Sequence, residues 1–334
     1  MTLNSHAHAA RRSVGLCLSS LAVWAWAPAW AEAPQFDAAQ WLARVQQAAV
    51  SRSYQGTLVY SSGGAVSSTR VLHLIEGRHR FERIDSLDGE ARQQLRHDDV
   101  LLTLWPRTRV AVFEPPDPVA DFPALPASHS RALESYEARM LGQERMAGID
   151  VDVVLLKSRD GLRFSQRLWA ERETGLLVRA DMVGPRGEVL DSSAFTDLKL
   201  GIRTGADSVV LPMKRLDGYR VLHPQSQRVQ LEAEGWSQSK PVAGFQLLSS
   251  TRRALEAIAG SGDARQVLQV VYSDGMTHVS VFIEPYDVQR HKPMRTSLGA
   301  TQTSMSRQGD WWITVMGDVP MTTVQQFETV LQRK

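Results

Sequence analysis

The chain has 334 residues, of which 38 are Lys or Arg, 36 are Asp or Glu and one is cysteine. A formal net charge of +2 excludes the strongly basic domain that nucleic-acid binding usually requires, and a hydrophobic fraction of 43% excludes a mainly disordered chain. The length predicts two domains.

The segment 1–31 has the layout of a secretory signal peptide. Arg11 and Arg12 precede an apolar run over 14–26, which is followed by Pro28 and the small-residue triplet ending at Ala31. A membrane-spanning helix needs about 20 apolar residues, and this run ends sooner, so we expect cleavage after Ala31 and export rather than anchoring. Because Arg11 and Arg12 would leave with the peptide, 36 of the 38 basic residues would remain against 36 acidic ones, with no cysteine.

The chain after the signal peptide begins with a predicted helix and continues as short strands. Asp37 is a suitable helix cap, and Trp41, Leu42, Val45 and Ala49 follow at helical spacing. The hydrophobic period then changes to two, and glycine-containing turns separate the strands. Tight turns between short strands favour an antiparallel meander over parallel units. The strands are expected over 54–60, 69–75, 79–84, 100–105 and 109–113.

A proline-rich stretch over 114–126 interrupts the meander, since proline cannot continue a central strand. Ser128 is then expected to cap a second helix that runs through Met140. Alternating apolar and polar residues predict that the sheet resumes with one apolar face, covered by the helices. The later strands are expected over 149–156, 162–169, 177–183 and 189–200.

A second, smaller domain is expected after a connector. Regular patterning weakens over 203–228, which we interpret as an interdomain linker between domains at 32–202 and 229–334. The C-terminal domain is predicted to be a β-rich α+β unit that a helix over 322–331 closes. Its strands are expected over 245–248, 267–272, 279–283, 300–306 and 311–316.

The sequence indicates no enzyme, no cofactor and no metal site. The segment Gly260-Ser261-Gly262-Asp263 lacks the lysine of a phosphate-binding loop, and no Gly-x-Ser-x-Gly motif occurs. His97-Asp98-Asp99 resembles the core of a metal-dependent phosphohydrolase. That chemistry needs further ligands from facing helices, whereas this segment lies between two predicted strands.

Two sets of residues are candidates for binding. Apolar residues predicted on the inner face of the first sheet are ordinarily core, but together they are candidates for an acyl-chain pocket, in which each buried methylene contributes about 0.8 kcal/mol. A basic cluster in the linker is ordinarily a solvated connector, but it is also a candidate contact for the carboxylates of a partner or the phosphates of a lipid. The pocket candidates are Leu58, Tyr60, Leu72, Leu74, Phe81, Leu101, Trp105, Val112, Val154 and Leu168, and the basic candidates are Lys214, Arg215, Arg220 and Arg228.

A set of motifs in a specific order resembles the MucB/RseB family over nearly all of the chain after residue 31. Each motif alone is weak, because it is turn and strand sequence, but their spacing together is specific. Two departures from the family are Lys240-Pro241-Val242-Ala243, where relatives often carry Trp-Leu-Pro, and Asp318 in place of glutamate. The matching motifs include Tyr54-Gln55-Gly56-Thr57, Arg80-Phe81-Glu82-Arg83, Arg159-Asp160-Gly161, Ser249-Ser250-Thr251-Arg252-Arg253, Tyr272-Ser273-Asp274-Gly275 and Ile313-Thr314-Val315-Met316-Gly317.

The resemblance implies a periplasmic regulator of an envelope-stress sigma factor of the sigma-E or AlgU type. Members of the family bind the periplasmic domain of a single-span anti-sigma factor and shield it from regulated proteolysis, and lipopolysaccharide or a related lipid releases it. The resemblance also implies that the first domain is a half-open antiparallel barrel with helices on one face, similar to the lipoprotein carriers LolA and LolB.

The rival interpretation is a periplasmic lipid or lipoprotein carrier similar to LolA. A carrier needs only the first domain, so the motifs of the second domain favour the regulator. We expect regulation by linked binding equilibria, in which lipid and partner weaken each other and the linker absorbs the motion. Self-association of the chain is left open.

Overall fold

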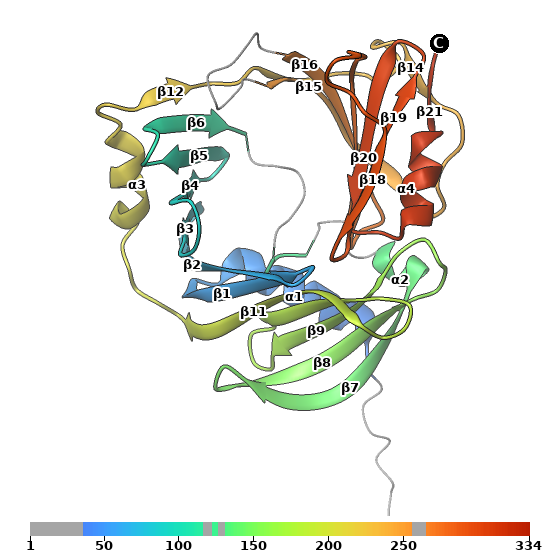
Figure 1. The fold of residues 1–334 in the computed structure, drawn as a ribbon. Coiled ribbons are helices and arrows are strands. Elements are labelled where there is room, and N and C mark those ends of the chain that lie inside the picture. The colour runs from blue at the N-terminus through green and yellow to red at the C-terminus, as the bar shows by residue number, and fades with distance from the viewer. Residues whose placement is uncertain (1–35, 116–121, 126–130, 256–264) are drawn as a thin grey trace, which may run out of the picture. The chain divides into compact units, whose positions relative to one another are not determined.

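The computed structural model describes residues 36–115, 122–125, 131–255 and 265–334 (Figure 1). The predicted signal peptide and Ser128 therefore lie outside the described residues. Among the residues that are described, no helix has both the length and the apolar character needed to cross a membrane. The helices are α1 Ala38–Ser51, α2 Ala132–Ser135, α3 Asp207–Lys214 and α4 Met321–Glu328.

The first part of the chain forms a large sheet of twelve strands. Neighbouring strands in this sheet pair antiparallel, except that β12 runs parallel to β6. The order across the sheet is β12-β6-β5-β4-β3-β2-β1-β11-β10-β9-β8-β7. In chain order the strands are β1 Tyr54–Ser62, β2 Ala65–Glu76, β3 His79–Ser86, β4 Gln93–His97, β5 Val100–Trp105, β6 Val110–Glu114, β7 Tyr136–Met146, β8 Ile149–Ser158, β9 Ser165–Glu171, β10 Leu177–Val183, β11 Val189–Leu200 and β12 Arg220–Leu222.

The C-terminal part of the chain forms a seven-stranded sheet and a two-stranded ribbon. The sheet order is β13-β15-β16-β17-β20-β19-β18, and β14 pairs with β21. The α+β class, with a large antiparallel sheet and a smaller β-rich part, is confirmed. The strands are β13 Ser226–Arg228, β14 Trp236–Gln238, β15 Gln246–Leu255, β16 Arg265–Ser273, β17 His278–Pro285, β18 Met294–Leu298, β19 Thr301–Gln308, β20 Trp311–Gly317 and β21 Leu331–Arg333.

Helix α1 forms where the sequence predicts it and covers one face of the large sheet. The Asp37 side chain accepts a hydrogen bond from the Gln40 N–H, which caps the helix. Trp41, Leu42 and Val45 are buried against β8, β9 and β10. Burial of each of these large side chains contributes about 1.5–3 kcal/mol, so the apolar face holds the helix on the sheet.

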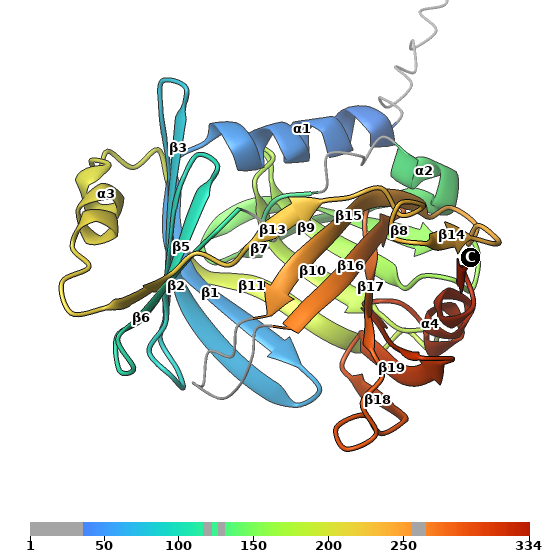
Figure 2. The same cartoon turned by 90° about the horizontal axis from the view of Figure 1, so that it is seen from above.

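Helix α3 lies on the opposite face of the same sheet. Leu74 and Phe81 are neighbours across β2 and β3, and they pack in one cluster with Val209 of α3. His73, which points the other way from Leu74, stacks on Tyr54 in the region that α1 covers. Figure 2 shows the two helices on different sides of the strands. The two helices that the sequence predicted, α1 and α2, contribute to the same apolar cluster, whereas α3, which the sequence did not predict, covers the other face.

The predicted second helix ends earlier than expected, because residues 136–140 are a strand. Among the described residues of the segment, the α-helix spans Ala132–Ser135, and Tyr136 begins the eleven-residue edge strand β7. The segment is rich in good helix formers, but β7 pairs with β8 along its length, from Tyr136 opposite Ser158 to Met146 opposite Ile149. This tertiary pairing, together with complete burial of Tyr136, overrides the local helix propensity.

The predicted linker over 203–228 contains ordered elements. Within it α3 packs on β3 and β4, and β12 adds to the large sheet beside β6. β13 then joins the smaller sheet beside β15. The domain boundary therefore stays a prediction, and the connector carries regular structure on both sheets.

The C-terminal core contains large aromatic residues from both sheet and helix. Trp236, Tyr272 and Phe327 are almost completely buried in one cluster. The closing helix is shorter than predicted, because α4 ends at Glu328 and Leu331 instead begins β21. Pairing of β21 with β14 accounts for this early end of the helix.

Candidate functional site

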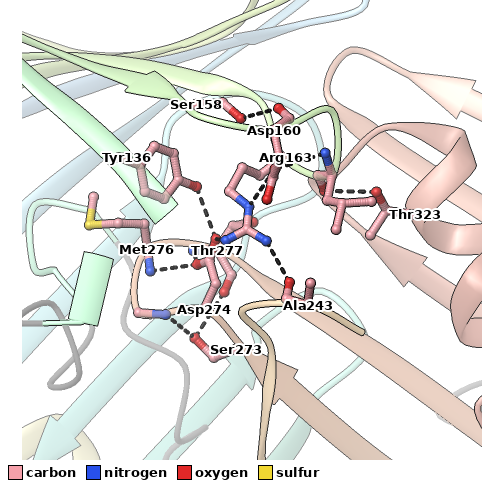
Figure 3. A network of polar contacts seen from close by, with 12 residues as sticks. Tyr136, Ser158, Asp160, Arg163, Ala243, Ser273, Asp274, Met276, Thr277 and Thr323 are labelled. Carbon is pink, nitrogen blue, oxygen red and sulfur yellow. Dashed lines mark hydrogen bonds and ion pairs between the residues drawn. The ribbon is translucent and has the colours of Figure 1, made fainter. Parts of the chain in front are cut away.

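A buried arginine joins the large sheet to the smaller one (Figure 3). Arg163 lies just before β9, and its side chain is 0% exposed. Its Nη2 donates to the carbonyl oxygen of Ala243 at 2.7 Å. Its Nη1 forms an ion pair with Asp274 at 3.3 Å, and its Nε forms one with Asp160 at 3.2 Å. The guanidinium also lies over the Phe245 ring, 4.9 Å from its centroid.

Asp274 is held on the other side of this junction by its own turn between β16 and β17. Its Oδ1 accepts hydrogen bonds from the N–H groups of Met276 and Thr277, both at 2.8 Å. The hydroxyl of Tyr136 donates to Oδ2 at 3.1 Å. Burial raises the pKa of Asp274, while these N–H groups and Arg163 oppose the shift. Such a pair is costly to bury. The Arg163 Nε and Nη1 form ion pairs but no hydrogen bonds with the described residues.

A second contact joins the sheets where the turn between β18 and β19 meets β1 and β11. Asp191 is 5% exposed. It accepts hydrogen bonds from the Tyr60 hydroxyl at 3.0 Å and from the Ala300 N–H at 3.1 Å. Gly299 lies so close to Asp191 and Ser62 that a side chain there would overlap both, and its φ of +56° also favours glycine. Polar groups of both sheets thus meet at this contact as well as at Arg163.

An open cavity of about 290 Å³ lies on the smaller sheet at the start of β15. Leu247 and Leu248 on its lining are 46% and 44% exposed. A β-bulge falls between Leu247 and Ser249, which disturbs the alternation there. The full lining is Arg228, Val229, Gln230, Leu247, Leu248, Ser249 and Ser250.

The same segment of β15 is an incomplete sheet edge. β13 pairs only with Thr251, Arg252 and Arg253, and the Val229 N–H bonds the Ser250 carbonyl oxygen beyond it. Among the described residues, no strand pairs with 246–249 on this side. Unpaired N–H and C=O groups on a strand edge are a template for an added strand. The cavity therefore combines backbone hydrogen-bonding groups, apolar side chains and the positive charge of Arg228.

Of the basic candidates from the sequence, Arg228 alone lines this cavity. Lys214 ends α3, Arg215 follows it, and Arg220 begins β12 in the large sheet. The structure therefore does not bring the four together at the cavity. Sequence reasoning missed Leu247 and Leu248, although two adjacent leucines at a strand start are a break in alternation that indicates a bulge.

The apolar pocket candidates divide between the two faces of the large sheet. Leu72, Leu74 and Phe81 pack toward α3. Val154 and Leu168 are buried under α1, while Tyr60 is 40% exposed. The strand registers place the remaining candidates on the α1 face as well, and these are Leu58, Leu101, Trp105 and Val112.

Two protein-family models together match residues 37–332 of the chain. The MucB/RseB N-terminal domain matches residues 37–233, and the MucB/RseB C-terminal domain matches residues 230–332. The N-terminal match includes the predicted linker.

Curated relatives carry names of regulatory proteins. The sigma factor AlgU regulatory protein MucB of Pseudomonas aeruginosa is 28% identical over 305 residues, which cover 87% of this chain and 89% of that protein. The sigma-E factor regulatory protein RseB of Escherichia coli K12 is 23% identical over 296 residues, covering 85% of this chain and 87% of the relative.

Solved structures of MucB share the fold. A structure of the Pseudomonas aeruginosa MucA/MucB complex matches with a TM-score of 0.67 and 26% identity, covering 90% of this chain and 99% of that one. MucB in complex with MucA(peri) matches with a TM-score of 0.65 and 25% identity, covering 89% and 99% of the two chains.

Proposed function

The chain belongs to the MucB/RseB family, and on this premise we propose that it is a periplasmic negative regulator of an envelope-stress sigma factor. It binds the periplasmic segment of a single-span anti-sigma factor and shields that segment from regulated proteolysis. The observation that carries the proposal is the match to both family domains over 37–332, together with a related MucB whose structure was solved in complex with MucA.

The cavity on β15 is the proposed contact for part of the anti-sigma segment. An extended peptide gains main-chain hydrogen bonds by pairing with the free edge at 246–249, and its apolar side chains cover Leu247 and Leu248. Arg228 attracts a carboxylate of the same peptide. Of the candidate basic residues, Arg228 is therefore the one proposed to contact the partner directly.

Lipid is proposed to release the partner through linkage. An acyl chain enters the apolar α1 face of the large sheet, and the accompanying rearrangement weakens the polar junctions at Arg163 and Asp191. Because the anti-sigma segment is proposed to bind across both sheets from the β15 cavity, this rearrangement weakens its binding. No catalytic step is needed, because the protein acts by changing which complex is populated.

Binding of the purified chain 32–334 to the periplasmic segment of the organism's anti-sigma factor tests the proposal. We expect saturable one-to-one binding, and slower cleavage of the segment by its protease when the complex forms. Leu248→Asp should weaken binding by about tenfold or more, since it places a charge in a desolvated contact. Arg228→Glu should weaken it as well.

Matched controls lie on β2 of the other sheet. Val66 is 66% exposed and Arg70 is also exposed. Away from the cavity, Val66→Asp replaces an exposed aliphatic side chain with a carboxylate, and Arg70→Glu reverses a charge as Arg228→Glu does. Both should bind like the unaltered chain. If Leu248→Asp binds the segment as tightly as the unaltered chain, the cavity is not the contact for the anti-sigma segment. Bound lipid without affinity for any anti-sigma segment would instead indicate a LolA-like carrier.

A further inference from the structure

Two histidines and an aspartate converge where β3 begins and where β4 turns into β5. The His79 Nδ1 lies 2.8 Å from the Asp98 Oδ2, and the His97 Nε2 lies 3.5 Å from the same oxygen. One ligand atom from each of the three residues lies within 4.8 Å of the others. We propose that this cluster binds a divalent transition-metal cation of the Zn²⁺ or Cu²⁺ type.

Asp98 is held in place so that one carboxylate oxygen faces the imidazoles. Its Oδ1 accepts the Arg80 N–H at 2.9 Å, and its own N–H donates to the Arg80 carbonyl oxygen at 2.9 Å. The Arg96 Nε donates to the Asp98 carbonyl oxygen at 2.8 Å. These contacts fix a backbone φ of +52°, which is unusual outside glycine. A ligand that is already oriented loses little freedom on binding a metal ion.

His97 supplies an imidazole nitrogen that lies at ion-pair distance from Asp98 but forms no hydrogen bond. Its ring stacks on Phe81 at a centroid distance of 4.5 Å, which fixes the ring orientation. Its Nε2 is shielded from solvent and has no hydrogen-bond partner among the described residues. Buried polar atoms in native proteins rarely lack a partner, because a protein group, a water or an ion satisfies them. His79 and Asp98 are 61% and 40% exposed at their side chains, so solvent can fill a fourth coordination position.

The spacing fits a small transition-metal ion. Bonds of about 2.0–2.2 Å to imidazole nitrogen and carboxylate oxygen place two tetrahedral ligands roughly 3.3 Å apart. The observed separations of 2.8 and 3.5 Å lie on either side of this value. Imidazole suits zinc, copper and nickel, whereas magnesium and calcium prefer oxygen ligands. The donor set therefore selects against Mg²⁺ and Ca²⁺.

The sequence pattern around His97 gave no reason to include His79. The two residues belong to different strands and meet because Phe81 of β3 pairs with His97 of β4. Asp99 does not belong to the cluster. The cluster lies on the large sheet, whereas the β15 cavity lies on the smaller one, so metal binding can be measured without the anti-sigma partner.

Calorimetric titration of the untagged chain 32–334 with Zn²⁺, and absorption spectroscopy with Co²⁺, test the proposal. We expect one ion per chain, with Mg²⁺ unable to compete. His79→Gln and Asp98→Asn should each weaken Zn²⁺ binding by at least about tenfold. Asparagine tolerates the positive φ at position 98, so this variant should keep its melting temperature.

His223→Gln is the matched control. His223 is exposed and stacks on Phe113 at 4.9 Å without belonging to the cluster, so its replacement should leave Zn²⁺ affinity unchanged. Equal Zn²⁺ affinity in the unaltered chain, His79→Gln and Asp98→Asn would overturn the proposal. Failure of the unaltered chain to bind Zn²⁺, or to shift the Co²⁺ spectrum, would overturn it as well.

Discussion

At the scale of single residues, the Arg163–Asp274 pair gives the contact between the sheets a direction, which an apolar contact does not. It fixes one orientation of the loop before β9 against the turn after β16, because the guanidinium, the carboxylate and the Tyr136 hydroxyl all have directional partners. Each group has given up hydration, so the loss of one partner leaves the other charge buried and unpaired.

Arg163→Met should therefore destabilise the protein strongly. We expect the free energy of unfolding to fall by about 3–5 kcal/mol, because Asp274 loses its counter-charge while it stays buried. Denaturant titration followed by tryptophan fluorescence measures the change. Arg70→Met, at an exposed position on β2, should change the free energy by less than about 0.5 kcal/mol. A similar small change for Arg163→Met would show that the junction does not hold the sheets together.

Glu171 makes a pH-dependent contribution at the end of β9. Burial raises the pKa of Glu171. Hydrogen bonds from Thr174 and from the Glu173 N–H lower that pKa by more than burial raises it, so the net shift is downward. A carboxylate whose pKa is depressed by folding stabilises the protein above its unfolded pKa, and this contribution is lost as the pH falls through the folded pKa.

Comparison of Glu171→Gln with the unaltered chain isolates this effect. The variant should be less stable at pH 7, because its neutral amide cannot accept the three hydrogen bonds to Glu171 equally well. The difference in free energy of unfolding should shrink as the pH is lowered below about 4.3, the ordinary pKa of a glutamate side chain. Urea titrations at a series of pH values measure it, and a difference that stays constant would contradict the account.

Sequence patterns identified residues of the junction around Arg163 without showing which of them pair. Asp160 and Asp274 both belong to motifs of the family resemblance, yet their positions along the chain gave no sign that Arg163 lies between them. The same limit applies to His79 and His97. Contacts between distant segments depend on strand register, which alternation within one segment cannot define.

At the scale of elements, alternation predicted strands well where a strand has a solvated and a buried face. It failed for β7, whose pairing with β8 makes an edge strand from residues that favour helix. It also gave no warning that α3 would cover Leu74 and Phe81 from the opposite face. Both errors concern the choice of a packing partner, which lies outside the segment itself.

The turn between β18 and β19 provides a direct test of how elements dock. Gly299→Ala should cost more stability than Gly309→Ala, although both glycines have φ near +60°. An alanine at position 309 meets open space and incurs only the backbone cost of about 1–2 kcal/mol. At position 299 it also overlaps Asp191 and Ser62. Equal losses in thermal unfolding of the two variants would show that the turn does not dock on β11.

At the scale of the whole molecule, the two sheets have separate apolar cores. The cluster of Trp236, Tyr272 and Phe327 is distinct from those under α1 and α3. The sheets are joined by polar contacts at Arg163, at Asp191 and between Arg253 and Glu114, and by apolar contacts of Met276 and Leu162. Composition and length predicted two domains, and the boundary between them stays a prediction.

The most direct measurement is the affinity of the chain 32–334 for the periplasmic segment of its anti-sigma factor, with and without lipopolysaccharide. The account predicts tight binding without lipid and weaker binding with it. Linkage further requires the segment to lower lipid affinity by the same factor. Absence of binding, or an affinity for the segment that lipid leaves unchanged, would contradict the central claim.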